Sequence, residues 1–296
     1  MTLRGVFPAI VTPFLPRGAG VDVAWIPGHV EYLRRGGVDG LLALGTTGEG
    51  PSLSMAERWA IIDTIMACAQ GLTVLVGTGC PALPDTIDIS RYAWEKGASA
   101  LLVVPPYYYK SPPGLYQYYH ALLQALPSEA QVLLYNIPSH SGVEIEDKLI
   151  DALRVAHPLQ LAGVKDTSGQ IEKTRHYIQR HPSLATFVGS DELASAALCS
   201  GAVGVISALA NLFPGLVAAV YRAHQSGGNT AAAQERLSRA RAILAPYPLY
   251  SALKWGLVWQ AGLPLSHVRP PLSSLTPQQV ESLEQEIRAL AEEASP

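Results

Sequence analysis

The stretch "LQLAGVKDTSG", residues 159–169, is the clearest local indication of the fold. Four of the six residues before Lys165 are apolar and none is charged, whereas Asp166, small polar residues and a glycine follow the lysine. A near-continuous apolar run of this kind is typical of a parallel strand that is buried on both faces. The stretch therefore predicts a buried strand that ends in a lysine, a residue that is almost never fully buried unless it is paired.

Seven other apolar runs have the same form and alternate with segments of helical character. Each run ends in Gly, Thr, Ser, Pro, Asp or Tyr. Eight strands that alternate with helices over about 225 residues predict an α/β fold, a TIM (β/α)₈ barrel, with an open doubly wound sheet as the alternative. Apart from the run that ends in Lys165, the expected strands lie within residues 5–14, 40–48, 72–79, 100–108, 131–139, 186–191 and 202–208.

Helix signals are strongest at two places in the chain. Ser54 and Glu57 have the spacing of a capping box at the start of the helix that precedes the third run. Beyond residue 225 the strand pattern stops, and three helical segments follow, the last of them beginning at "TPQQ", residues 276–279. We therefore predict a catalytic barrel domain over residues 1–225 and a C-terminal three-helix extension over residues 226–296.

Composition narrows the function classes. The formal net charge is −3 and the basic residues are scattered, so the sequence indicates neither a nucleic-acid partner nor an anionic membrane surface. No apolar run reaches the roughly 18–20 residues of a membrane span, and the N-terminal residues do not resemble a signal peptide. Three widely spaced cysteines without a CxxC pair predict buried free thiols. We expect a soluble, cytoplasmic protein.

The active site of a barrel of this type lies at the carboxyl ends of its strands. The predicted strands end in a lysine, several tyrosines, hydroxyl side chains and glycines. They show no set of His and carboxylates at metal-ligand spacing, no GxGxxG and no Walker sequence. We therefore expect no metal and no organic cofactor, and the amine of Lys165 is the candidate reactive group.

Lys165 differs from the other five lysines (Lys96, Lys110, Lys148, Lys173 and Lys254), which are expected in helices or loops with polar neighbours or a solvent edge. Burial penalises the charged form of an amine, and the neutral amine is the form that attacks a carbonyl to make a Schiff base. The alternative is a lysine that is ion-paired with Asp166 or Asp191 at the rim. The residues alone leave both interpretations open.

Two further features also have two interpretations. Tyr135 ends the neighbouring predicted strand, where it could transfer protons or could simply pack against the barrel end. The "GTTGE" segment, residues 45–49, could hold a carboxylate with backbone N–H groups and hydroxyls, or could be a plain turn between strand and helix. On one rim, these groups together suit carbonyl chemistry on a small acidic substrate.

Several motifs, in order, resemble one family across essentially the whole chain. They are "GTTGEGPSLSMAER", "PPYYYKSP", "YNIPSHSG", "GVKDTSG", "GVIS" and "ALKWGLVWQAGL". This set is similar to the dihydrodipicolinate synthase / N-acetylneuraminate lyase family. The resemblance implies a TIM barrel with a three-helix extension and class I, Schiff-base lyase chemistry on pyruvate or another 2-oxo acid. It also implies a homotetramer built from two tight dimers.

Matched to the family motifs, the catalytic residues are Lys165, which forms the Schiff base, Tyr135, the general acid/base, Thr46, a member of its proton relay, and Tyr108. In the synthases the tyrosine matching Tyr108 reaches across the dimer into the neighbour's relay. The expected substrate-binding residues are Thr47 for the pyruvate carboxylate, Ile206 in the pyruvate pocket, His140, and Gly189 at the end of the seventh predicted strand.

His140 is the departure from the synthase pattern. Lysine-pathway synthases carry an arginine there, which binds the carboxylate of aspartate semialdehyde, and an imidazole cannot grip a carboxylate in two places. The leading hypothesis is a pyruvate-dependent aldolase for a 2-oxo-3-deoxy sugar acid or a 4-hydroxy-2-oxo acid. The alternatives are 4-hydroxy-tetrahydrodipicolinate synthase, a dehydratase acting on deoxy sugar acids, and a non-catalytic sensor of 2-oxo acids. His140 could also be a loop residue without a role.

Overall fold

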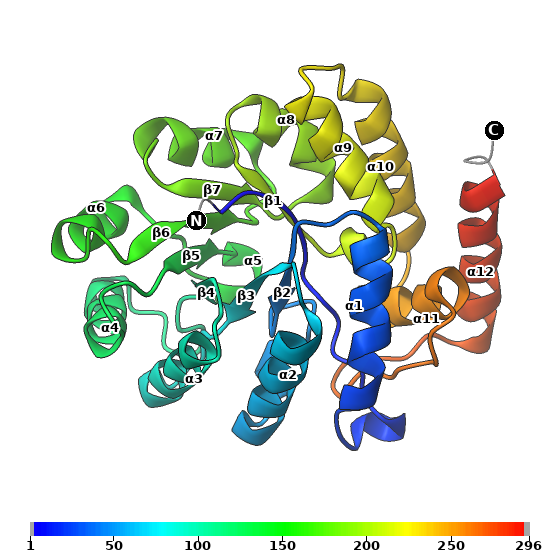
Figure 1. Cartoon of the computed structure of the whole chain (residues 1–296), viewed down its shortest axis with the longest axis horizontal. Coiled ribbons are helices and arrows are strands. Elements are labelled where there is room, and N and C mark those ends of the chain that lie inside the picture. Colours follow the sequence, from blue (N-terminus) through cyan, green and yellow to red (C-terminus); the bar gives the residue numbers. More distant parts are fainter. Residues whose placement is uncertain (1–2, 293–296) are drawn as a thin grey trace.

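The computed structural model describes residues 3–292 and contains one eight-stranded parallel sheet. Sheet neighbours follow the order of the chain from β2 to β8, β1 pairs with β8, and the Ala9–Leu42 bridge joins β1 to β2. The sheet therefore curls into a nearly closed barrel (Figure 1), which confirms the predicted fold and excludes the doubly wound alternative. The strands are β1 (Gly5–Pro8), β2 (Gly40–Ala43), β3 (Thr73–Gly77), β4 (Ala100–Val103), β5 (Val132–Asn136), β6 (Leu161–Asp166), β7 (Ala185–Val188) and β8 (Gly204–Ser207).

Helices surround the strands in Figure 1. The capping box predicted for α2 is present, because the Ser54 and Glu57 side chains each bond the other residue's backbone N–H. Thr276 and Gln279 bond reciprocally in the same way at the start of α12. The helices are α1 (Ile26–Arg35), α2 (Met55–Cys68), α3 (Leu83–Glu95), α4 (Pro112–Ala125), α5 (Pro138–Ser141), α6 (Asp147–Ala156), α7 (Ile171–Arg180), α8 (Ala194–Cys199), α9 (Pro214–Gln225), α10 (Ala231–Leu244), α11 (Leu249–Ala261) and α12 (Pro277–Glu292).

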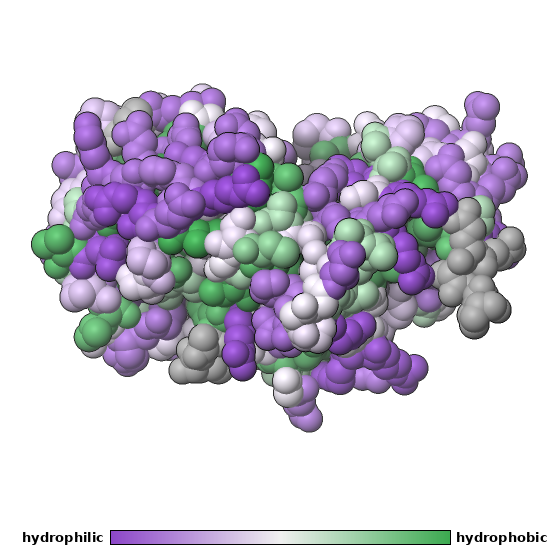
Figure 2. Space-filling model, turned by 90° about the horizontal axis from the view of Figure 1, so that it is seen from above, coloured by the Kyte–Doolittle hydropathy of each residue, from purple (hydrophilic) through white to green (hydrophobic). Residues whose placement is uncertain are grey.

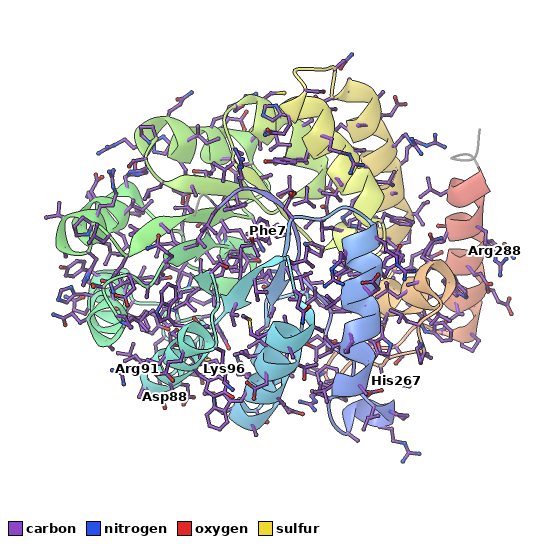
Figure 3. The ribbon with its side chains drawn as sticks, in the orientation of Figure 1. Phe7, Asp88, Arg91, Lys96, His267 and Arg288 are labelled. Carbon is purple, nitrogen blue, oxygen red and sulfur yellow. The ribbon has the colours of Figure 1, made fainter. Side chains whose placement is uncertain are left out.

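The interior of the barrel is filled by apolar side chains from every strand. Phe7, at the centre of the view in Figure 3, meets Phe187 edge to face with 5.6 Å between ring centroids. Leu42, Leu75, Leu102 and Leu133 complete this inner layer. A second apolar layer lies between the strands and the helices. The strand ends above the inner layer are therefore rigid supports for a site.

The three C-terminal helices that the sequence predicts are present as α10–α12. They lie on one side of the barrel, with α10 beside α9 and α11 near α1 (Figure 1). Gln234 of α10 joins them to the barrel, because its side chain donates to the Asp191 carbonyl (3.0 Å) and accepts from the Ser195 N–H (2.8 Å). The division into domains at residue 225 stays a prediction. The outer ends of those predicted domains, residues 1–2 and 293–296, lie outside the described part of the chain.

Two predictions about burial are wrong. Lys254, expected at a solvent edge, is buried in α11 with 1% exposure. Cys199, expected to be buried, is exposed, whereas Cys80 is buried and Cys68 half-buried; all three thiols are free. The face shown in Figure 2 is mostly hydrophilic, with hydrophobic residues in separate patches. Within residues 3–292 no helix has both the length and the apolar character needed to cross a membrane.

Candidate active site

Lys165 lies near the carboxyl end of β6, beside Tyr135 on β5, and the two residues are register partners in the sheet. Both are buried, with 4% and 5% exposure. The Lys165 Nζ stands over the Tyr135 ring, 4.2 Å from its centroid, in a cation–π geometry. The sequence therefore places the predicted nucleophile and the predicted acid/base in direct contact because parallel strands end at the same edge of the sheet.

Asp166, the first carboxylate that could neutralise Lys165, is engaged elsewhere. It accepts hydrogen bonds from the Asn136 amide (2.8 Å), the Thr174 hydroxyl (2.6 Å) and both the N–H and hydroxyl of Ser168. These bonds hold Asp166 on the helix side of the barrel end, where it fixes the β6–α7 turn. None of the bonds recorded for Asp166 among residues 3–292 comes from Lys165.

Asp191, the second carboxylate, accepts from the Ser207 hydroxyl and, at 3.4 Å, from the Leu209 N–H. Burial raises the pKa of Asp191 to about 6, although the Ser207 hydroxyl favours its charged form. Across residues 3–292 the structure records no carboxylate oxygen within 4.0 Å of the Lys165 Nζ. The amine therefore lacks an ion-pair partner in the described part of the chain, which contradicts the rim ion-pair interpretation.

The Tyr135 hydroxyl lies 3.4 Å from the Thr46 hydroxyl, at the long end of hydrogen-bond range. Thr46 and Thr47 stand in the tight turn after β2. Both residues that flank this turn have left-handed backbone conformations, Leu44 with φ 57° and Glu49 with φ 53°. Such strain in non-glycine residues costs roughly 1–3 kcal/mol each and persists only where surrounding contacts hold it. Thr46 and Thr47 therefore stand on a strained turn, whereas Tyr135 approaches Thr46 from β5.

A cavity of about 240 Å³ opens beside Lys165 and contains most of the predicted site. Its wall includes seven of the eight candidate residues, namely Lys165, Tyr135, Thr46, Thr47, Ile206, His140 and Gly189. Tyr108 is the exception. Its ring is 76% exposed on the loop after β4 and packs edge to face with Tyr109 at 5.1 Å. The proposed role of Tyr108 across a subunit contact stays a prediction.

Gly189 makes room for a cluster of reactive side chains. A Cβ at Gly189 would lie 2.0 Å from the Thr167 Oγ1 and 3.0 Å from the Lys165 Cε, so a side chain there would displace both groups. The Thr167 hydroxyl is buried, lines the cavity and has no hydrogen-bond partner among residues 3–292. An unpartnered buried hydroxyl costs free energy, which a ligand in the cavity would recover. The sequence analysis did not identify Thr167, although it directly follows the Lys165–Asp166 pair.

Other cavity residues come from regions that the sequence analysis did not connect with the site. Arg241 of α10 and Leu249 and Tyr250 of α11 reach the cavity from the C-terminal extension. The Arg241 Nε lies 3.5 Å from a carboxylate oxygen of Glu192, which follows β7. These residues give the mouth of the cavity both charges and an aromatic hydroxyl. Their only sequence signal is helical periodicity, which does not reveal the packing of a helix against a distant loop.

His140 lies on the rim of the cavity in the short helix α5. It is exposed, and its Nδ1 is 3.0 Å from the Ser139 hydroxyl. This position suits contact with the part of a ligand that points toward solvent. Among the described residues no cluster of three or more His, Cys, Asp or Glu side chains has the arrangement of a metal site.

The geometry combines four features: an amine without an ion-pair partner among residues 3–292, a tyrosine hydroxyl beside it, a turn rich in hydroxyls and N–H groups, and a polar mouth. An amine held this way can attack a carbonyl carbon. The tyrosine can accept or donate a proton one bond further along the same ligand. The arrangement therefore supports covalent carbonyl chemistry on a small 2-oxo acid.

Comparison with known sequences gives a consistent picture. Residues 2–290 match the Dihydrodipicolinate synthetase family. A protein from Chloroflexus aurantiacus named "Uncharacterized DapA-like lyase" is 46% identical over 282 residues, which cover 95% of this chain and 94% of that protein. The 4-hydroxy-tetrahydrodipicolinate synthase of Methanopyrus kandleri is 32% identical, with 97% of this chain and 96% of the relative covered.

Solved structures agree with the sequence comparison. YagE, a prophage protein of the dihydrodipicolinic acid synthase family from E. coli K12 that was solved with pyruvate, superposes with a TM-score of 0.90 at 28% identity, covering 98% of this chain and 99% of YagE. The wild-type sialic acid aldolase of Ruminococcus gnavus superposes with a TM-score of 0.90 at 25% identity, covering 98% and 97% of the two chains.

Proposed function

Because the chain belongs to the dihydrodipicolinate synthetase family and is a carbon–carbon lyase, we propose that it cleaves or forms the C3–C4 bond of a 4-hydroxy-2-oxo acid through a Schiff base on Lys165. The preferred substrate class is a 2-oxo-3-deoxy sugar acid, with pyruvate and an aldehyde as the products. The observation that carries this proposal is the buried Lys165 Nζ, which faces the cavity without an ion-pair partner in the described chain and lies 4.2 Å from the Tyr135 ring centroid.

The first step is binding of the carboxylate. Thr47 and the backbone N–H groups of the turn that contains it offer hydrogen-bond donors to the carboxylate that is attached to C2. With the carboxylate there, the adjacent C2 carbonyl lies toward Lys165. Ile206, buried at the end of β8, closes the apolar side of this subsite, where the C3 carbon fits.

The second step forms the covalent bond. The neutral amine of Lys165 attacks C2, Tyr135 donates the proton with which the carbinolamine hydroxyl leaves as water, and a protonated imine remains. Before attack, the Lys165 Nζ stands over the ring of Tyr135, 4.2 Å from its centroid. After attack, the face of the same ring stabilises the positive charge of the iminium. The imine then acts as the electron sink for the next step.

The third step breaks the carbon chain. Tyr135 takes the proton of the C4 hydroxyl, and Thr46 supports the proton transfer through the 3.4 Å contact between the two hydroxyls. The C3–C4 electron pair moves into the imine to give an enamine, and the aldehyde leaves. Protonation of C3 and hydrolysis of the imine release pyruvate and restore the Lys165 amine. The same steps in reverse form the bond.

The polar groups at the mouth of the cavity favour an aldehyde that carries several hydroxyl groups. The Thr167 hydroxyl is buried without a partner in the described chain, and Ser190, Glu192 and His140 add further donors and acceptors along the wall. A polyhydroxy chain can satisfy these groups simultaneously. An unsubstituted aldehyde would leave them unpaired, which lowers its affinity.

The alternative is 4-hydroxy-tetrahydrodipicolinate synthase, in which pyruvate condenses with aspartate semialdehyde. One observation favours it: Arg241 supplies a guanidinium at the cavity although His140 occupies the position expected for the arginine. Its contact with Glu192 is long, at 3.5 Å, so a substrate carboxylate could compete for it. In this alternative the acceptor carboxylate binds at Arg241 rather than at the β5–α6 loop.

We also propose the assembly that the family resemblance implies, a homotetramer of two tight dimers. The exposed Tyr108 would then enter the active site of a neighbouring subunit and join the relay of Tyr135 and Thr46. Sedimentation velocity tests the assembly, and a Tyr108→Phe variant tests the relay. A monomer with full activity would refute both proposals.

The decisive test treats the protein with pyruvate and sodium borohydride and locates the reduced adduct by peptide mass spectrometry. The expected result is one modification, on Lys165, and none in a Lys165→Met variant. An unmodified wild-type protein would overturn the Schiff-base proposal. A screen of aldehydes then separates the two candidates, since a strong preference for aspartate semialdehyde that Arg241→Ala abolishes would favour the synthase.

A further inference from the structure

The turn that carries Thr46 and Thr47 ends at Glu49, whose side chain is withdrawn from solvent. The Glu49 carboxyl group has 0% exposure and points away from the cavity, toward the C-terminal extension. Its backbone is left-handed, with φ 53°, and its N–H bonds the Thr46 carbonyl at 3.0 Å. The position of the Glu49 side chain is therefore coupled directly to the backbone that presents both threonines.

The partner of Glu49 is Lys254, 205 positions later in α11. The Lys254 Nζ lies 2.5 Å from the Glu49 Oε1 and also donates to the His267 carbonyl. The Glu49 Oε2 accepts the N–H of Arg269 at 2.9 Å. His267 is labelled in Figure 3 near the lower end of α1, where its N–H bonds the Phe14 carbonyl. The carboxylate is thus held by two groups of the extension, the Lys254 ammonium and the Arg269 N–H.

A second set of contacts holds the other side of the same turn. The Arg269 guanidinium forms a two-point ion pair with Glu57 (2.8 and 2.6 Å) and donates to the Ser52 carbonyl. Arg58 donates to the carbonyls of Gly50 and Leu53. The turn is therefore fixed from both directions, which explains how its two strained residues persist.

Helix α11 also lines the cavity, through Leu249 and Tyr250. One helix thus carries both the cation that holds the turn and part of the cavity wall. A buried ion pair is weak evidence for stability, because desolvation of both charges offsets their attraction. A pair of this kind is better explained when it fixes a geometry that function needs.

We propose that the Glu49–Lys254 pair is a positioning device, through which the C-terminal extension holds Thr46 and Thr47 in place for the substrate carboxylate and the Tyr135 relay. Glu49 and Lys254 act through the two threonines and touch no reacting atom. The proposal makes the extension part of the catalytic architecture. It rests on the proposed Schiff-base function, because its readout is the capture of pyruvate.

The test compares Lys254→Met, Glu49→Gln and the double variant with the wild type. The pyruvate concentration that gives half-maximal borohydride trapping on Lys165 and the steady-state KM and kcat are measured, together with the Tm. We expect the half-saturating pyruvate concentration and the KM to rise at least about tenfold, the effect of losing one hydrogen bond to a charged group. The kcat should change less, because Lys165 and Tyr135 stay in place.

The double variant distinguishes positioning from a purely structural role. It leaves no unpaired buried charge, so its Tm should recover relative to the single variants, whereas its KM should stay high. A KM that returns to the wild-type value along with the Tm would refute the proposal. Leu153→Ala in α6, a buried residue remote from the turn, is the stability-matched control. It should lower the Tm without raising the KM.

The outcomes also distinguish failure of the positioning proposal from failure of the Schiff-base function on which it rests. A wild-type protein that pyruvate and borohydride leave unmodified refutes the Schiff-base function. A wild-type protein that is modified on Lys165, with variants that need the same pyruvate concentration, refutes only the positioning role. All variants are assayed well below their Tm, with circular dichroism to confirm that each is folded.

Discussion

The two buried lysines of this protein have opposite surroundings. Lys254 has 1% exposure and lies against the Glu49 carboxylate and the His267 carbonyl. Lys165 has 4% exposure and contacts the ring of Tyr135, with no ion-pair partner in the part of the chain that the structure describes. Burial lowers the pKa of Lys254 to about 8, although the Glu49 charge acts in the opposite direction. The same side chain is ion-paired in one place, and in the other it faces a cavity without an ion-pair partner among the described residues.

The difference shows that burial alone does not identify a reactive lysine. Both lysines lose hydration, but only Lys254 receives a carboxylate in exchange. Lys165 faces a cavity, so the group that completes its environment can be a ligand. A cavity and a missing partner together are the signature of a functional lysine, and each of the following variants tests one part of that statement.

Lys165→Met should have the largest effect. Methionine nearly matches the length and volume of the lysine stem, so the fold should be kept while the nucleophile is lost. We expect turnover to fall by roughly 10⁴-fold or more, as is typical for loss of a covalent nucleophile. The free energy of unfolding should stay equal or increase, because an unpaired buried amine is removed. Steady-state kinetics and urea unfolding measure both quantities.

A large loss of stability in Lys165→Met would contradict the comparison, because it would mean that Lys165 has a structural partner. The matched control is the same substitution at the other buried lysine. Retained turnover in Lys165→Met would refute the Schiff-base chemistry altogether.

Lys254→Met should show the opposite pattern in stability. Removing the cation leaves the Glu49 carboxylate buried without its charge partner, which costs about 3–5 kcal/mol in free energy of unfolding. The Glu49→Gln/Lys254→Met double variant should recover a large part of this loss. Urea unfolding of the four proteins gives the coupling energy as a double-mutant cycle. A Lys254→Met variant as stable as the wild type would show that the ion pair contributes nothing.

His29 extends the comparison to a buried base for which the described part of the chain records no carboxylate partner. It has 1% exposure in α1, and burial lowers its pKa to about 4, although a 3.4 Å contact with the Asn211 carbonyl acts in the opposite direction. Between pH 6.5 and pH 4 the unfolded chain therefore binds a proton at this residue that the folded chain does not. The folded state should lose about 3 kcal/mol relative to the unfolded state over that range as the pH falls.

The measurement is urea unfolding of wild type and His29→Gln at several pH values. The difference between the two proteins cancels the titration of groups that they share. The difference in free energy of unfolding between the two proteins should be constant above pH 6.5. As the pH approaches 4, His29→Gln should become more stable relative to the wild type. A gap that does not change with pH would mean that His29 titrates normally in the folded state.

The sequence was sufficient to predict the fold and to bring Lys165 and Tyr135 to one rim of the barrel, because both depend on local patterns. The Schiff-base role of Lys165 came from the family resemblance and stays a prediction. Each of the eight apolar runs overlaps one strand, although β7 begins one residue before its run, at Ala185. Lys165 and Tyr135 lie near strand ends, where parallel pairing makes them neighbours. A few residues are enough to predict where a buried strand ends. For the same reason the capping signals at Ser54 and Thr276 correctly marked helix starts.

The residues that the C-terminal extension contributes to the cavity and to the turn could not be predicted from local sequence patterns. Lys254 has ordinary helical neighbours, and nothing near it in sequence indicates that Glu49, 205 residues earlier, covers it. Arg241 and Tyr250 reach the cavity only because α10 and α11 pack against particular loops of the barrel. Which side chains of a helix reach a particular loop depends on how the helix packs in the tertiary structure, and periodicity does not specify that packing.

Thr167 has a hydroxyl without a hydrogen-bond partner in the described chain, just as Lys165 has an amine without an ion-pair partner there. Among the variants proposed here, we expect the Thr167 variant to have the smallest effect. Its Oγ1 lacks a partner in the described chain and faces the cavity, whereas the equally unpartnered Oγ1 of Thr186, in β7, is absent from the residues that line it. Thr167→Val should lower kcat/KM for a 4-hydroxy-2-oxo acid by about tenfold, the cost of one hydrogen bond to the substrate. Pyruvate trapping on Lys165 should be unchanged, because pyruvate has no C4 hydroxyl.

Thr186→Val should leave both measurements unchanged and raise the free energy of unfolding, since it removes a buried hydroxyl that no ligand can reach. Equal effects of the two variants on kcat/KM would mean that a missing partner marks no ligand contact here, and the inference from the unpaired Lys165 would lose its parallel.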